Sequence, residues 1–375
     1  MAEFDVIVLG VGGMGSSACQ NLAKRGLSVL GIEQFDMAHG LGSSHGKSRM
    51  IRKAYHEHPD YVPLLRRSYD LWDDLEHHTG DKLFHRTGVL YVGHNTTSES
   101  LQGVELSASQ HDIPIEPLSP EDFHSRFPQF KLPQDYRAIF EPDAGFINVE
   151  GAVTAFCKEA QRLGATLHFN ERVERWTSDG TSVTVHTSRG VYRAAKLIIT
   201  AGAWSSQFLQ LQEKDVFPLT VNKVSLFWFN SPQPEKLTDM PCYGFEMPYG
   251  FVYGFPFNAQ DGIKVAIHLP GENVADPSNL DRTVPPEELA SVAQCVRECM
   301  PYVDASTTKD SAACMYTMSA DGHFVLDLHP DYSNVAFAAG FSGHGFKFCP
   351  VIGEVLTDLV TTGTTEHPIG FLRRR

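Results

Sequence analysis

The sequence predicts an α/β fold in which a Rossmann-like dinucleotide-binding domain is joined to a second α+β domain built on a mixed sheet. Two glycine-rich turns carry this prediction, Gly10-Val-Gly-Gly-Met-Gly15 after an apolar strand and Gly340-Phe-Ser-Gly-His-Gly345 after a later apolar run. The third observation is Glu33, which ends the next strand about 20 residues beyond the first turn, where an acid reaches an adenosine ribose. Because glycines let the backbone approach a pyrophosphate, one nucleotide held from both ends of the chain is expected.

The composition sets the size and the class of the protein. A chain of 375 residues with 42% hydrophobic residues can bury more than one core, so two domains are expected. The formal charge of −14 argues against nucleic-acid and acidic-membrane partners. No apolar run reaches the roughly 18 residues of a spanning helix, and no basic segment precedes the first apolar stretch. We therefore expect a cytoplasmic protein, and a monomer.

Cysteine and histidine spacing predicts neither disulfides nor a metal site. The seven cysteines include no C-x-x-C pair, which indicates reduced thiols. His56-Glu-His58 and His77-His78 are expected on the surface, and Arg373-Arg-Arg375 is expected to be a solvated tail.

The elements follow in order from apolar periodicity and from helix-ending residues. The expected helices start after the first glycine turn and end at Gly26, then cover about 60–77, run from an Asn148 cap to Gly164, and cover 285–300 and about 350–360. Residues 82–145 are expected to alternate short strands with proline-rich turns. Other expected strands are Phe4–Leu9, Leu27–Ile32, Thr166–Phe169, Lys196–Thr200 and several between 215 and 270, with short apolar strands from 313 onward.

The domains predicted from this order are discontinuous. Residues 1–85, 146–212 and 318–375 are assigned to the nucleotide-binding domain. Residues 86–145 and 213–317 are assigned to the substrate domain. The chain is thus expected to leave the first domain and to re-enter it twice.

Four phrases taken together resemble one known family over essentially the whole chain. They are Gly10-x-Gly12-x-x-Gly15, the stretch from Gly42 to Tyr55, Cys314-Met-Tyr-Thr317 and Gly340-Phe-Ser-Gly-His-Gly-Phe-Lys347. The chain is similar to the monomeric sarcosine oxidase and N-methyltryptophan oxidase family, flavoenzymes of the D-amino-acid-oxidase-like superfamily. This resemblance implies an FAD domain of the glutathione-reductase or p-hydroxybenzoate-hydroxylase type.

The resemblance also implies how the cofactor is held. FAD is expected to be linked through its 8α-methyl carbon to Cys314, with Arg49 and His45 as cations that favour the thiolate. Cys349 is the rival thiol, expected to pack under the last helix. The other residues assigned to FAD are Gly10, Gly12, Gly13, Met14, Gly15, Glu33, Ser44, His45, Val173, Gly202, Trp204, Gly343, His344, Gly345, Phe346 and Lys347.

For the substrate, the resemblance implies an amino acid carboxylate held by Arg52 and Lys347, with Tyr316 in the same pocket. Tyr253 and His268 match pocket residues, although a tyrosine or histidine at such a position is as often a core residue. Lys264 matches the lysine that stabilises negative charge developing on oxygen, with Arg49 as its competitor.

The activity implied is oxidation of the N-methyl group of an N-methyl amino acid, with O2 as acceptor and formaldehyde and hydrogen peroxide as products. Two alternatives stay open: oxidation of a cyclic imino acid of the pipecolate or proline type, and a flavin dehydrogenase with a different acceptor. The Tyr243-Gly-Phe-Glu-Met-Pro-Tyr249 stretch departs from the sarcosine-type pattern, which leaves the preferred side chain open.

Overall fold

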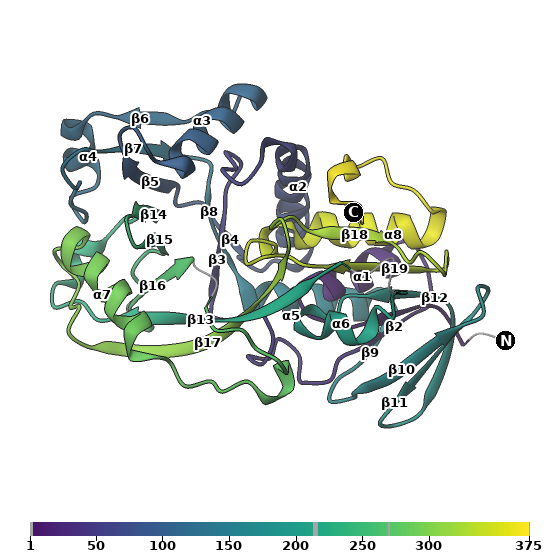
Figure 1. Ribbon diagram of the computed structural model, residues 1–375. Coiled ribbons are helices and arrows are strands. Elements are labelled where there is room, and N and C mark those ends of the chain that lie inside the picture. Colours follow the sequence, from purple (N-terminus) through teal and green to yellow (C-terminus); the bar gives the residue numbers. More distant parts are fainter. Residues whose placement is uncertain (1–2, 213–216, 269–270, 375) are drawn as a thin grey trace.

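A computed structural model describes residues 3–212, 217–268 and 271–374. Two eight-stranded sheets and a small three-stranded sheet form the molecule (Figure 1). The first sheet and its helices lie on the right in that view and the second sheet lies on the left, while β13 and β17 run from one part toward the other. The arrangement confirms the predicted α/β class with a second mixed sheet.

The first sheet has a parallel centre. Its strand order is β10-β11-β12-β1-β2-β9, with β19 pairing β12 in parallel and β18 pairing β19. The central strand β1 is buried over its last four residues, as expected for a parallel strand that is covered on both faces. The bounds are β1 Phe4–Leu9, β2 Val29–Ile32, β9 Thr166–His168, β10 Val173–Ser178, β11 Val183–Thr187, β12 Val191–Ile199, β18 Val325–Leu328 and β19 Val335–Ala339.

Three helices form one layer against this sheet. They are α1 (Gly13–Lys24), α5 (Val149–Arg162) and α8 (Cys349–Thr362), and α1 contacts both of the others. The approach of α1 to α8 is close, because a Cβ on Gly353 would lie 2.2 Å from Ser17 Oγ. This packing fixes the start of α1, and therefore the glycine turn before it, against the end of the chain.

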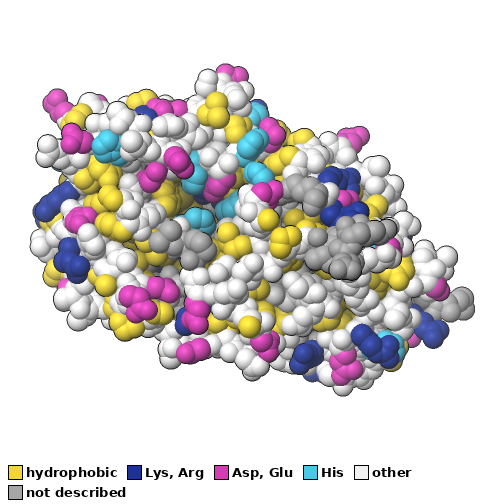
Figure 2. Space-filling view, in the orientation of Figure 1, with side chains coloured by type: hydrophobic (Ala, Val, Ile, Leu, Met, Phe, Trp, Pro, Cys, Tyr) yellow, Lys and Arg dark blue, Asp and Glu magenta, His cyan; other side chains and the backbone are white. Residues whose placement is uncertain are grey.

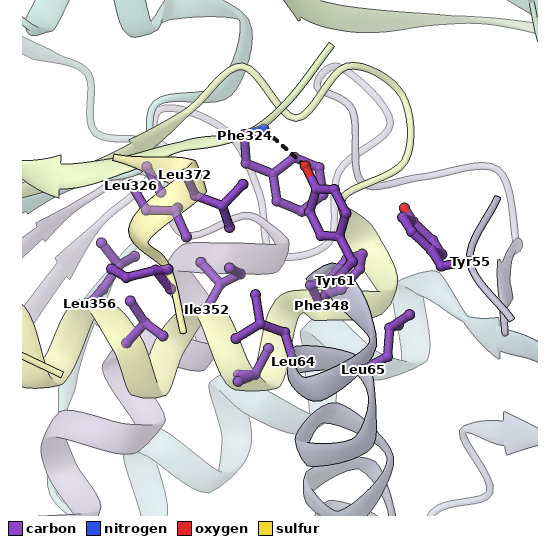
Figure 3. Close-up of a cluster of buried hydrophobic side chains, with 14 of the residues drawn as sticks. Tyr55, Tyr61, Leu64, Leu65, Phe324, Leu326, Phe348, Ile352, Leu356 and Leu372 are labelled. Atoms are coloured by element: carbon purple, nitrogen blue, oxygen red, sulfur yellow. Dashed lines mark hydrogen bonds between the residues drawn. The ribbon is translucent and has the colours of Figure 1, made fainter. Parts of the chain in front are cut away.

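Helix α2 (Val62–Thr79) also contacts α8. Figure 3 shows Leu64 and Leu65 of α2 in one apolar cluster with Phe348, Ile352 and Leu356 near the start of α8. In the same cluster, the backbone N–H of Phe324 donates to Tyr61 Oη at 3.3 Å. The cluster holds the segment just before α8 in place.

The second sheet has the order β17-β13-β16-β15-β14-β5-β7-β6, and its neighbours are antiparallel except for β14 with β5. One face packs on α4 (Pro120–Arg126) and α7 (Pro286–Cys299), and α3 (Glu99–His111) contacts β5. The bounds are β5 Val89–His94, β6 Glu116–Leu118, β7 Tyr136–Glu141, β13 Leu219–Phe229, β14 Cys242–Met247, β15 Gly250–Gly254, β16 Ile263–His268 and β17 Thr308–Ser319.

The small sheet has the order β3-β8-β4 and lies where the chain passes between the two larger sheets. Its strands are β3 Ser48–Ile51, β4 Phe84–His85 and β8 Gly145–Asn148. The remaining short helices are η1 Pro59–Tyr61, η2 Gly202–Trp204, α6 Ser205–Phe208, η4 Pro234–Leu237, η5 Pro277–Asn279, η6 Phe346–Phe348 and η7 Gly370–Leu372.

Two expectations about the elements are wrong. Residues 82–145 contain two helices besides strands: Ser98 caps α3 by accepting from Leu101 N–H, and Ser119 caps α4 by accepting from Asp122 N–H. Strand β17 is a long ladder of 12 residues that pairs with β13, and not a short strand beginning at 313.

The C-terminal tail is also not solvated as expected. Leu372 is fully buried, and Arg373 Nη1 lies 2.5 Å from Asp327 Oδ1, while Arg375 lies outside the described residues.

The predicted domain boundaries stay a prediction. The strands of the first sheet come from 4–32, 166–199 and 325–339, and those of the second come from 89–141 and 219–319. Within the described ranges, no helix is long and apolar enough to cross a membrane.

Candidate active site

A long cavity runs from the first glycine turn to the second sheet, with an empty volume of about 1800 Å3 that is partly open to solvent. Most of the residues assigned to the cofactor line it: Gly10, Gly12, Gly13, Met14, Glu33, Ser44, Val173, Gly202, Trp204, Gly343, His344, Gly345, Phe346 and Lys347. Arg49, Arg52, Tyr253, His268 and Tyr316 line the same cavity. Residues from both ends of the chain and from its middle thus share one wall.

At one end of the cavity, main-chain atoms form much of the wall. Helix α1 begins there, and its N-cap residue Gly12 makes no side-chain capping bond. Gly10 has φ +88°, and a Cβ on Gly15 would lie 1.8 Å from Gly10 O, so both positions require glycine. The Gly13 N–H donates to Ser44 Oγ at 3.1 Å, and the positive dipole end of this 12-residue helix lies at this part of the cavity.

Glu33 lies beside this turn with 6% of its surface exposed. Its Oε2 accepts from Val11 N–H at 2.9 Å and its Oε1 from Phe35 N–H at 3.1 Å. These bonds fix the carboxylate at the tip of β2, where the sequence predicts a ribose contact.

Four predicted site residues are not among those that line the cavity, namely Gly15, His45, Cys314 and Lys264. Cys314 is 1% exposed and lies on the same apolar face of the second sheet as Tyr316 and Ala266. Arg49 Nη2 is 3.6 Å from its Sγ and donates to Ser43 O at 3.0 Å.

Cys349, the rival thiol, is fully buried and would contact a Cβ on Gly13 at 2.7 Å. Burial raises the pKa of this thiol well above its ordinary value. Cys349, at the start of α8, therefore packs against the glycine turn.

His45 is not the cation that the sequence analysis expects. Burial, and next the charge of Arg49, lower its pKa to about 3, so the imidazole is neutral at pH 7. Arg49 is then the cation next to Cys314.

Lys264 on β16 is buried, and its side chain forms hydrogen bonds with the loop before β3 and with the start of β3. Its Nζ donates to Gly46 O at 2.6 Å and to Ser48 O at 2.9 Å. Burial, and next the charge of Arg49, lower the pKa of this lysine well below its ordinary value.

At the other end of the cavity two buried cations approach the same tyrosine. Arg52 lies 4.8 Å and Lys347 4.9 Å from the ring centroid of Tyr55. Lys347 Nζ also donates to His344 O at 2.6 Å. Burial, and next the charge of Arg52, lower the pKa of Lys347 well below its ordinary value.

Arg52 already has a partner. Its Nη2 donates to Glu57 Oε1 at 2.6 Å. Burial would raise the pKa of Glu57, but the Arg52 guanidinium and nearby cations outweigh burial and hold that pKa well below its ordinary value. The two side chains form an ion pair on the cavity wall.

His268, Tyr316 and Tyr253 form a polar group facing this end. His268 Nδ1 is 3.2 Å from Tyr316 Oη, and the rings of Tyr253 and His268 are 6.5 Å apart. Burial lowers the pKa of His268, which favours a neutral imidazole.

Among the wall residues that sequence reasoning missed are His56, Glu57 and Phe251. His56, expected on the surface, lies on the wall with its ring 5.5 Å from that of Phe251. Burial is the main cause that lowers its pKa to about 4. The only available signal was the proximity of His56 and Glu57 to Arg52 in the sequence.

The family model described as FAD dependent oxidoreductase matches residues 5–359. The chain belongs to this family. The cavity of this FAD-dependent oxidoreductase fits the cofactor, since glycines that a Cβ would crowd, the start of helix α1 and a buried carboxylate line its nucleotide end.

Curated relatives of this oxidoreductase cover nearly its whole length. It is 40% identical to the monomeric sarcosine oxidase of Bacillus sp. (strain B-0618), over 98% of this chain and 94% of that protein. It is 41% identical to the monomeric sarcosine oxidase of Streptomyces avermitilis, over 99% and 97%. It is 35% identical to the N-methyl-L-tryptophan oxidase of Yersinia pestis (strain Pestoides F), over 94% of each.

Solved structures agree on the fold. The open form of NikD, an amino acid oxidase of nikkomycin biosynthesis, has a TM-score of 0.88 at 25% identity and covers 100% of this chain and 98% of that chain. Glycine oxidase from Geobacillus kaustophilus has a TM-score of 0.82 at 22% identity, with 99% and 98% covered.

Proposed function

We propose that this protein catalyses the oxidative demethylation of an N-methyl amino acid, with FAD as acceptor of the hydride and O2 as final oxidant. The observation that carries the proposal is the pair of buried cations, Arg52 and Lys347, on the cavity wall opposite the nucleotide end. The named relatives, sarcosine and N-methyl-L-tryptophan oxidases, support the N-methyl substrate over a cyclic imino acid and over a non-oxygen acceptor.

Substrate binding begins with an exchange of partners. Arg52 is paired with Glu57, so an incoming carboxylate competes for a guanidinium that is already positioned by that ion pair. Lys347, whose Nζ lies 4.9 Å from the Tyr55 ring centroid, adds a point charge. Together they orient the substrate and leave its amine toward the interior of the cavity.

The surrounding groups favour the neutral amine, which is the form that can release a hydride from its methyl carbon. Arg49, Arg52 and Lys347 put positive charge around that position, and nearby positive charge lowers the pKa of an amine. His268, neutral because of its lowered pKa, can accept the amine proton at its imidazole, and Tyr316 Oη holds the ring in place.

FAD supplies the chemistry of accepting the hydride and passing electrons to oxygen. We propose that Cys314 Sγ would hold it covalently through the 8α-methyl carbon, with loss of the thiol proton and one methyl proton and with O2 taking the two electrons released; Arg49 Nη2, 3.6 Å from Sγ, supports this assignment. Arg49, which lines the cavity, and Lys264, which interacts electrostatically with Arg49, are the two side chains that we propose to stabilise negative charge on oxygen. A monomeric state and a cytoplasmic location stay predictions.

A panel assay tests the proposal. The purified holoprotein is mixed with sarcosine, N-methyl-L-alanine, glycine, L-proline and pipecolate, and O2 uptake, hydrogen peroxide and formaldehyde are measured. The proposal predicts equal amounts of peroxide and formaldehyde from the N-methyl substrates. Peroxide from proline or pipecolate alone, without formaldehyde, would overturn it.

A further inference from the structure

A second cavity opens next to the substrate end of the first one. It has an empty volume of about 1220 Å3, partly open to solvent. His56, Glu57, Phe251 and His268 line both cavities, so the second continues from the place where the carboxylate and amine are proposed to bind. Figure 2 shows histidine and acidic side chains near one another in the middle of the face, between the two parts of the molecule.

The wall of this second cavity combines apolar surface with negative charge. Met247, Tyr249 and Phe251 provide apolar surface, and Glu57, Glu99 and Glu246 provide carboxylates. Among the described residues that line it there is no lysine or arginine. A side chain with an aliphatic stem and a positive end matches both properties, because such a stem packs on apolar surface while its charge stays near the rim.

The surroundings of two of these carboxylates lower their pKa values. Burial opposes ionisation of Glu246, but hydrogen bonds from Ser100 and Ser98 outweigh burial and lower its pKa. Glu57 is held ionised by Arg52. Glu99 is exposed in the first turn of α3, at the rim.

An unsatisfied atom lies where the two cavities meet. Glu57 Oε1 accepts from Arg52 Nη2, while the buried Oε2 of Glu57 has no hydrogen-bond partner among the described residues, and His56 Nδ1 is 3.6 Å from it. A buried acceptor without a donor is unfavourable, so a donor brought by the substrate would be stabilised there.

We infer that the second cavity holds the substrate's side chain and that it favours N-methyl amino acids with a cationic side chain over those with a neutral one, and rejects acidic ones. The inference rests on the proposed function, because it takes the carboxylate to lie on Arg52 and Lys347. It assigns the side-chain preference to the Glu57, Glu99 and Glu246 carboxylates.

The test compares kcat/KM for Nα-methyl-L-lysine, N-methyl-L-norleucine and N-methyl-L-glutamate, with sarcosine as the reference without a side chain. The wild-type protein should prefer the lysine analogue over the norleucine analogue by about three- to tenfold, an advantage that shrinks as ionic strength rises. Glu99→Gln should reduce this preference about two- to fivefold without changing kcat/KM for sarcosine.

Glu287→Gln is the matched control, since Glu287 is also an exposed acid in the first turn of a helix, α7, and lines neither cavity. It should leave all ratios unchanged. Equal use of the three larger substrates, or use of sarcosine alone, would overturn the inference and leave the proposed function standing. No oxidation of sarcosine or of any N-methyl substrate would instead remove the proposed function.

Discussion

The two ends of the large cavity are built in different ways. The nucleotide end is main chain from one short stretch, with Gly10 and Gly15 in a single turn and Glu33 at the tip of the next strand. The substrate end is formed by side chains from segments that are far apart in the sequence. Arg52 follows β3, and Lys347 lies in η6. The first end is fixed by backbone geometry and the second by buried charge.

This difference indicates at which end of the cavity substitutions and pH should change the reaction. Among the basic groups, burial and nearby positive charge lower the pKa values of Lys347 and His268 at the substrate end and of Lys264 beside Arg49. At the nucleotide end, carboxylate and backbone bonds hold a rigid frame. We therefore expect binding of the nucleotide to survive changes that abolish attachment, reoxidation or substrate binding.

The largest expected effect is complete loss of covalent flavin. Cys314→Ser should release FAD on acid precipitation and remove the fluorescent flavin band from a denaturing gel, because serine offers no thiolate to form the bond. Noncovalent FAD should still bind, since the glycine turn and Glu33 are unchanged. Cys349→Ser is the control and should keep the band; loss of the band in that variant would move the attachment to Cys349.

Next in size is the reaction with oxygen. Lys264→Met should slow reoxidation by about 10²-fold or more, the scale of removing one preorganised contact to a developing anion. Anaerobic reduction by substrate should stay within about tenfold, since hydride transfer places no negative charge on oxygen.

Stopped-flow measurement of both half-reactions decides this. Because Lys264 Nζ also bonds to Gly46 O and Ser48 O, the covalent flavin content is checked in the same samples. An unchanged oxygen rate would remove Lys264 from the mechanism and leave Arg49 as the cation for oxygen.

A smaller effect is expected on carboxylate binding. Lys347→Met should weaken substrate and simple carboxylate inhibitors alike by about 1.5–3 kcal/mol, the range for a hydrogen bond to a charged group. Arg52→Met should also weaken both ligands. The loss of binding free energy should be smaller by the free energy that Arg52 gains from its ion pair with Glu57 in the absence of ligand. Titration of the flavin spectrum with acetate measures both, and unchanged affinity in either variant would show that its cation does not hold the carboxylate.

The last expected effect is on folding stability and not on the chemistry. Glu141 is buried beneath the substrate end and accepts from Lys53 N–H at 2.6 Å, and burial raises its pKa to about 7. The folded state therefore keeps a proton that the unfolded chain would lose, so stability from this group is full below the ordinary value of 4.5 and is lost as pH rises through 7. The loss is up to about 3 kcal/mol.

Glu141→Gln should keep the hydrogen bond and abolish that pH dependence. Thermal unfolding of the wild type and the variant between pH 5 and 8 compares the two slopes. Parallel curves would show that Glu141 does not titrate in this range.

The nucleotide end could be predicted from sequence because its parts are local. A strand, a glycine turn, a helix and an acid within Phe4–Glu33 leave few alternatives, and the structure has β1, α1 and β2 in that order. Helix α4 had a readable signal, since Ser119-Pro120-Glu-Asp122 is a typical helix start. Helix α3 had a weaker one, because its apolar positions are separated by serines and Gly103.

The substrate end could be predicted only by resemblance. Nothing in the spacing of Arg52 and Glu57 indicates that they pair, because five residues in a loop do not define a shared face. The neutral state of His45 depends on its burial beside Arg49, which only the tertiary structure provides. Side chains from distant segments determine these properties.

The most direct test of the proposed demethylation is to identify which carbon atom of sarcosine is oxidised. Sarcosine labelled with 13C in its N-methyl group is incubated with the holoprotein and O2, and the products are followed by NMR. Oxidation at the N-methyl carbon predicts labelled formaldehyde and unlabelled glycine, each in an amount equal to the hydrogen peroxide formed. Glyoxylate together with labelled methylamine would show attack at the α-carbon and would contradict it.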